Sequence, residues 1–117
     1  MGYESQLFVG RGLPEVENDP AWLQVQTIFK LGKMGYDGFW HDLLKRHPAP
    51  EEPQWFVFAD DGDTEILEDR YGDCLVELPV FEVIAALEDY DYAPAQAAAA
   101  YLRAWTGGEL TILHYGY

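Results

Sequence analysis

The chain has 117 residues, of which 49% are apolar and 15% aromatic, a composition that predicts one folded domain over residues 1–117. Twenty-one Asp and Glu stand against seven Lys and Arg, giving a net charge of −14. This charge argues against direct binding to nucleic acid or to an anionic membrane, because both need Lys and Arg. A single cysteine, no signal-peptide pattern and no long apolar run predict a cytoplasmic protein.

The first half of the chain contains two predicted strands and a helix. Residues 5–10 form a short strand, followed by a loop rich in Gly, Pro and Asn. Residues 22–34 mostly alternate between apolar and polar side chains, which is typical of a half-buried strand. Asp37 can cap a short helix, which ends before Pro48 with basic residues in its last turn.

The second half begins with a predicted hairpin. Residues 55–60 and 65–70 are expected to pair around the turn Asp61-Gly62-Asp63-Thr64, because Asp-Gly tolerates the positive φ of tight turns. Residues 74–78 either continue the return strand or form another one. The second half therefore adds two or three strands before its helices.

Two helices and a final strand complete the predicted elements. Pro79 suits a first helical turn, and Phe81, Ile84, Ala85 and then Leu87 or Glu88 follow with helical spacing. A second helix runs from Pro94 to about residue 105, where Gly107 and Gly108 end it, and residues 109–117 form a strand. The order predicts an α+β fold with a mostly antiparallel sheet of about four to five strands and two to three packed helices.

The negative charge is concentrated in the second part of the chain. Residues 1–50 carry six acids and five bases, whereas residues 51–117 carry fifteen acids and only two bases, Arg70 and Arg103. Such segregation favours an interaction surface over a charge that serves solubility alone. The predicted partner-binding residues form two clusters: Asp60, Asp61, Asp63, Glu65, Glu68, Asp69 and Asp73; and Glu88, Asp89, Tyr90, Asp91 and Tyr92.

Each cluster has a separate physical argument. In an extended strand, Asp61, Asp63 and Glu65 would lie about 6.6–6.8 Å apart on one face, the spacing of every second phosphate along one DNA strand. In the second cluster, acids near a helix C-terminus oppose the helix dipole, and tyrosines are common anchors at protein interfaces. The alternative interpretation is that the tyrosines pack in the core and the acids are only solvated.

Motifs for catalysis or for cofactor binding are absent from the sequence. A calcium loop that starts at Asp61 would need Gly at its sixth position and Glu at its twelfth, where Ile66 and Gly72 stand. The three histidines and Cys74 lack the spacing of a zinc site, and Asp73 should raise the pKa of the neighbouring thiol. We therefore predict no metal, no cofactor and no catalytic activity, and a structural role for His114.

In size, charge and lack of catalytic motifs, the chain resembles the small acidic inhibitors that phages encode against bacterial defence systems. Anti-CRISPR proteins and DNA-mimicking anti-restriction proteins are examples. The resemblance is one of general type and implies no residue roles. It implies a non-catalytic inhibitor in the host cytoplasm, whose acidic face occupies a basic, nucleic-acid-binding surface of a defence nuclease or effector complex.

Two other functions remain open. An immunity protein that neutralises a nuclease toxin has a similar profile of size and charge. A structural or assembly module would use its acidic surface only for solubility, and its affinity for a partner would respond little to salt. The sequence leaves the oligomeric state undetermined.

Overall fold

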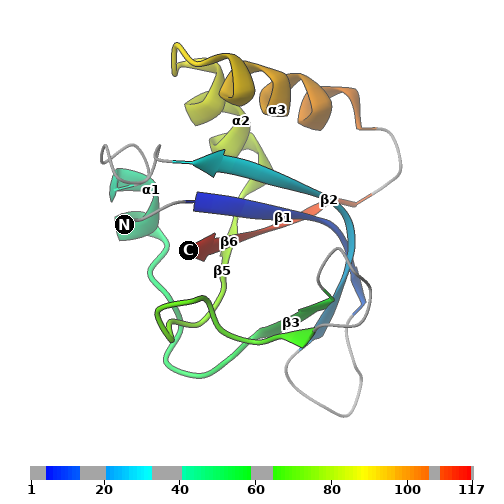
Figure 1. Cartoon of the computed structure of the whole chain (residues 1–117), viewed down its shortest axis with the longest axis vertical. Helices are drawn as coiled ribbons and strands as arrows, with labels where there is room; N and C mark the ends of the chain where they lie inside the picture. The colour runs from blue at the N-terminus through cyan, green and yellow to red at the C-terminus, as the bar shows by residue number, and fades with distance from the viewer. Residues whose placement is uncertain (1–4, 14–20, 33–40, 59–64, 106–108, 117) are drawn as a thin grey trace.

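The computed structural model describes residues 5–13, 21–32, 41–58, 65–105 and 109–116 (Figure 1). These residues form six strands and three helices. In chain order they are β1 (Ser5–Leu13), β2 (Ala21–Gly32), α1 (His41–Arg46), β3 (Trp55–Phe58), β4 (Glu65–Ile66), β5 (Val76–Leu78), α2 (Val80–Glu88), α3 (Ala93–Ala104) and β6 (Thr111–Gly116).

One curled sheet contains the six described strands in the order β4-β3-β2-β1-β6-β5. Neighbouring strands are antiparallel except β2 and β3, which are parallel. The α+β class is confirmed, but the predicted four to five mostly antiparallel strands are corrected to a mixed sheet of six. The connection from β2 to β3 includes α1, and a long crossover of this kind permits parallel pairing. Val76–Leu78 is a strand of its own.

The central strand pair, β1 and β2, contains a register shift, and this shift explains why residue 10 is a glycine. Val9 pairs with Thr27 and Gly10 with Val25, so Gln26 has no partner opposite it. A Cβ on Gly10 would lie 2.0 Å from the carbonyl oxygen of Gln24, which excludes any side chain there. The loop predicted directly after residue 10 is wrong at its start, because β1 continues through residue 13.

The two helices α2 and α3 cover the outer face of the curled sheet, as Figure 1 shows. Leu7 and Val9 of β1 pack there with Leu87 of α2 and Leu102 of α3. The α3 face that meets them is otherwise made of alanines, whose small side chains permit a close approach. No helix among the described residues is long and apolar enough to span a membrane.

The predicted helix after Pro79 is confirmed as α2, and its buried face includes only some of the residues that showed helical spacing. Val83, Ile84 and Leu87 are buried, whereas Phe81 is 87% exposed and Ala85 is exposed. The helix begins at Val80, after Pro79 in the N-cap position. Helical spacing alone does not decide which side of α2 faces the core, because Phe81 and Val83 are both apolar and lie on different sides.

The inner face of the sheet encloses a second core. Its buried members are Phe8, Leu23, Val57, Leu75 and Leu113. The two edge strands, β4 and β5, approach each other on this side. An isolated β-bridge pairs Glu68, two residues after β4, with Cys74, two residues before β5. The curl therefore nearly closes, and the segment between β4 and β5 lies over the closure.

Candidate functional site

The β4–β5 segment, residues 65–77, holds most of the described part of the first predicted acidic cluster. Its tip is a turn built by Asp69, whose Oδ1 accepts hydrogen bonds from the backbone N–H groups of Tyr71 and Asp73, both at 2.9 Å. The backbone N–H of Arg70 also donates to the carbonyl of Gly116, at 3.1 Å, which fixes the turn against β6. Burial raises the pKa of Asp69, and the two backbone donors oppose that rise. Asp69 is therefore a turn-forming residue.

The other carboxylates of the β4–β5 segment face solvent. Glu65, Glu68, Asp73 and Glu77 are exposed. None of them forms an ion pair within the described part of the chain. This segment therefore presents four unneutralised carboxylates over thirteen residues.

The thiol of Cys74 responds to the combined charge of this segment. Burial is the largest cause that raises its pKa. The carboxylates of Glu68, Asp73 and Asp69 add to the rise, in that order. The pKa of Cys74 is therefore raised, as predicted, mainly by burial and in addition by three carboxylates rather than by Asp73 alone.

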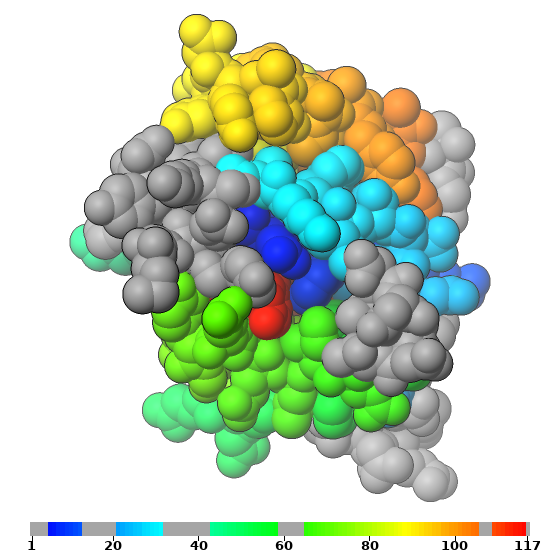
Figure 2. Space-filling model, in the orientation of Figure 1, coloured from blue at the N-terminus to red at the C-terminus, as the bar shows by residue number. Residues whose placement is uncertain are grey.

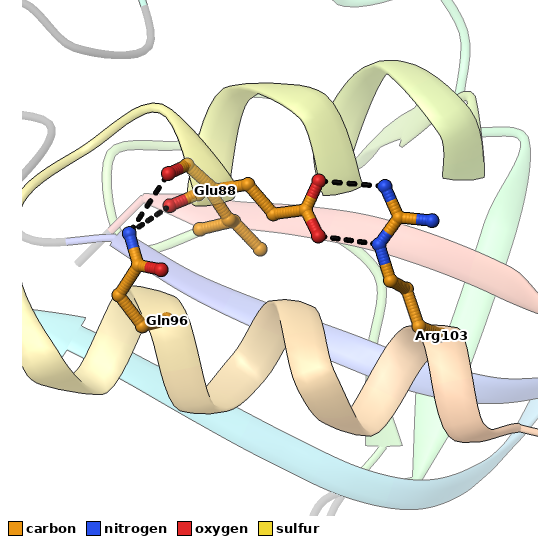
Figure 3. Close-up of polar contacts among 4 residues, drawn as sticks. Glu88, Gln96 and Arg103 are labelled. Atoms are coloured by element: carbon orange, nitrogen blue, oxygen red, sulfur yellow. Dashed lines mark hydrogen bonds and ion pairs between the residues drawn. The ribbon is translucent and has the colours of Figure 1, made fainter.

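The second predicted cluster lies at the turn from α2 to α3, where the side chain of Glu88 and the backbone carbonyls of the turn have partners within the fold. The Glu88 carboxylate forms a bidentate ion pair with the Arg103 guanidinium of α3 (Figure 3). Hydrogen bonding to Arg103 is the main cause that lowers the pKa of Glu88. Nε2 of Gln96 donates to the carbonyls of Leu87, Glu88 and Tyr90, at 3.4, 2.9 and 2.7 Å. The unfavourable position of Glu88 at a helix end is therefore offset within the fold.

The remaining members of the second cluster divide between core and solvent. Tyr90 packs against the outer core, and its ring meets that of Tyr92 edge-on, with centroids 6.1 Å apart. Tyr92 is 39% exposed, and Asp89 and Asp91 are exposed. The alternative of core tyrosines with solvated acids thus fits Tyr90.

The structure does not bring the two clusters together. The α2–α3 turn lies at one end of the longest axis of the molecule, and most of the β4–β5 segment lies in the other half (Figure 1). The space-filling view shows β1 and β2 crossing the surface between them (Figure 2). One partner groove would therefore meet one cluster, and the β4–β5 segment is the end with the larger group of unpaired carboxylates.

Part of the first cluster falls outside the described residues. Asp60, Asp61 and Asp63 belong to residues 59–64, as does the predicted Asp-Gly turn. The antiparallel pairing next to this turn is confirmed, because Val57 pairs with Ile66 and Phe58 with Glu65. The return strand predicted over residues 65–70 is wrong in its extent, because β4 ends at Ile66 and Asp69 builds a turn. The row predicted for Asp61, Asp63 and Glu65 stays a prediction.

The described histidine side chains are held by neighbours within the fold. His114 Nε2 and the Oγ of Ser5 share a hydrogen bond of 3.1 Å in the core. His47 Nε2 lies 2.7 Å from the Glu82 carboxylate, which also pairs with Arg46 at 3.1 Å. The hydrogen bond to His47 is the largest cause that lowers the pKa of Glu82. The described residues contain no group of His, Cys, Asp and Glu that could hold a metal.

An open pocket of about 490 Å³ lies between the end of α1 and β5. Its walls combine Pro48, Pro50 and Trp55 with the charged groups of Arg46 and Glu77. His47 lines the same pocket, and both His47 and Arg46 lie against the carboxylate of Glu82.

Sequence reasoning missed an aromatic surface on the outer face of β2 and β3. Trp22 stacks on Phe56 and on Phe58, with centroid distances of 4.8 and 5.0 Å and an interplanar angle of 18° in both pairs. Alternation within residues 55–58 indicated that Phe56 and Phe58 share a face. Nothing in the sequence brought Trp22 beside them, because that neighbour relation depends on the parallel pairing of β2 and β3.

Comparison with known proteins gives no relative for this arrangement. No family model, no curated protein and no solved structure matches the chain.

Proposed function

We propose that the protein is a non-catalytic inhibitor that binds a basic, nucleic-acid-binding surface of a partner protein through the β4–β5 segment. One observation carries the proposal. The exposed carboxylates of this segment have no ion-pair partner among the described residues, whereas Glu82 and Glu88 each have one. Other exposed acids of the described residues, Glu51, Glu52, Asp89, Asp91 and Glu109, also lack an ion pair, and the β4–β5 segment holds the largest group of such acids within one short stretch.

Charge complementarity explains what such a surface would recognise. Carboxylates held close together repel one another, which disfavours the compact state of the isolated protein. A surface rich in Lys and Arg relieves that repulsion, speeds encounter between the two proteins and discriminates against acidic partners. Proteins that handle nucleic acid present such surfaces for phosphate contacts. Occupation of the groove would exclude the nucleic acid sterically and electrostatically, without turnover and without a cofactor.

An immunity protein against a nuclease toxin would use the same chemistry, and only the identity of the partner separates the two functions. An assembly module is favoured by a different observation. Phe81 is 87% exposed and Tyr71 is 54% exposed, which suits apolar contact with a partner. Binding through Phe81 would depend little on salt, whereas binding through carboxylates would weaken as salt rises.

Charge reversal at the two clusters tests the proposal. The test variant is Glu68→Lys with Asp73→Lys, and the control is Asp89→Lys with Asp91→Lys, which makes the same change in net charge at the other cluster. Each tagged protein is used to capture partners from a cell lysate at about 0.1 M and about 0.5 M salt. The captured protein is identified, and its displacement by duplex DNA is measured.

The expected partner is a nucleic-acid-handling protein that the unmodified chain and the control capture at low salt. Capture should fall at high salt, with added duplex DNA and in the test variant. Equal loss in both variants would mean that total charge matters and the β4–β5 segment does not. Retained capture in the test variant would contradict the proposal directly.

A further inference from the structure

The outer face of β2 and β3 carries an aromatic stack that the core does not require. Trp22 lies between Phe56 and Phe58, and the three rings are nearly parallel. The inner face of the same strands already supplies Leu23 and Val57 to the buried core. The stack therefore belongs to the surface of the sheet, and it forms one continuous aromatic row.

This row is only partly shielded from water. Trp22 and Phe56 are half-buried, and Phe58 is 37% exposed. The helices α2 and α3 pack over the other end of the sheet, away from β3 (Figure 1). Exposed aromatic rings grouped on a rigid sheet are typical of contact surfaces, because they supply large apolar area at a small cost in conformational entropy.

The charge beside the row selects the kind of partner. Glu65 of β4 pairs directly with Phe58, so both side chains project from the same face. Residues 59–64, which join these two positions, include three aspartates in the sequence. Among the described strand residues, the register puts one base on this face: Arg11 of β1, which pairs with Gln24 of β2 and lies two strands away from Phe58. The free side of the row is thus flanked by carboxylate.

We propose that the row formed by Trp22, Phe56 and Phe58 accepts an arginine side chain from a basic segment of the partner, with Glu65 as the hydrogen-bond acceptor. A guanidinium is planar, stacks on an aromatic face and keeps its N–H edge free for a carboxylate. A lysine ammonium is more strongly hydrated and has no flat face to stack. This inference rests on the proposed function and names the side chain that anchors the partner.

Two other occupants fit the observations less well. A second copy of the chain would bring another charge of −14 against the first. A nucleobase could stack on the same rings, but its phosphates would face the carboxylate of Glu65 and the acidic segment beyond it. A cationic peptide satisfies both the aromatic and the electrostatic features.

The test measures binding of fluorescein-labelled nona-arginine and nona-lysine peptides by fluorescence anisotropy at low salt. Phe58→Leu removes the ring and keeps an apolar side chain, and Glu65→Gln removes the charge. Phe81→Leu is the matched control, because it replaces an even more exposed phenylalanine outside the row. Circular dichroism and thermal unfolding of each variant establish that it is folded.

The unmodified protein should bind nona-arginine more tightly than nona-lysine. Phe58→Leu should weaken nona-arginine binding about two- to fivefold, with a smaller effect on nona-lysine, and Glu65→Gln should weaken both. Phe81→Leu should change neither affinity. Salt-sensitive binding with equal affinity for the two peptides and no effect of Phe58→Leu would overturn the aromatic site and leave the proposed function intact. Binding of neither peptide would overturn both.

Discussion

Replacement of His114 by Gln should flatten the dependence of stability on pH below neutrality. The imidazole of His114 is 4% exposed and shares a hydrogen bond with the buried hydroxyl of Ser5. It lies on β6, paired with Leu7 of β1 and Val76 of β5, so apolar neighbours flank it on both sides. Burial lowers the pKa of His114 from 6.5 to about 4.

The sign and size of this change in the free energy of unfolding follow from the proton affinity of His114 in the folded and unfolded states. The folded protein binds this proton more weakly than the unfolded chain does, so the contribution of His114 to stability is complete above pH 6.5 and is lost as the pH falls towards 4. From the two pKa values, the free energy of unfolding should fall by about 2 kcal/mol at pH 5 and about 3 kcal/mol at pH 4 through this group alone.

Urea unfolding of the unmodified protein and of His114→Gln, at several pH values from about 7.5 to about 5, measures this contribution. Titration of the many carboxylates is common to both proteins, so the difference between the two curves isolates His114. An imidazole titration by NMR gives the folded-state pKa independently, even if the variant is unstable. Parallel stability curves, together with an imidazole that titrates near 6.5, would refute the reasoning.

Two further predictions concern the backbone and the helix pair, and both are measured by urea unfolding. Gly10→Ala should cost more than about 3 kcal/mol, because its Cβ would meet a carbonyl oxygen at 2.0 Å. Gly72→Ala, at a φ of 84° in open space, should cost only about 1–2 kcal/mol, and equal costs would contradict the steric argument. Gln96→Ala should cost about 1 kcal/mol by leaving α2 carbonyls without their donor. Arg103→Gln should cost less, since its ion pair is on the surface, and the reverse order would contradict our view of the turn.

Several elements could be predicted because local sequence determines them. Alternation within residues 22–34 gave β2, and Pro94 with the two glycines after residue 105 gave α3 to within about a residue at each end. The parallel pairing of β2 with β3 could not be predicted in this way. It depends on how the chain returns after α1, which is a tertiary property with no local signal.

The sequence predicts the charge of the candidate site, but it does not predict which of its carboxylates have structural partners within the fold. Counting acids placed the first cluster over residues 60–73, and its described members are exposed except for the half-buried Asp69. The same count treated Asp69 and Glu88 as equivalent to their neighbours, although one builds a turn and the other joins two helices. The partners of these two carboxylates are backbone N–H groups and a residue fifteen positions away, and charge patterning reports on neither.

The different roles of the acids bear on how the chain tolerates a charge of −14. Where a carboxylate meets a base, at Glu82 and Glu88, it joins separate helices, so that the charge contributes to the fold. Other carboxylates meet no base among the described residues, and the largest group of these is exposed on the β4–β5 segment, beside an aromatic row. The β4–β5 segment holds five acids and one base, Arg70, so the repulsion among its acids is compensated only in part. A cationic partner would supply that compensation, and it would do so at the end of the molecule where rigid aromatic rings can hold it.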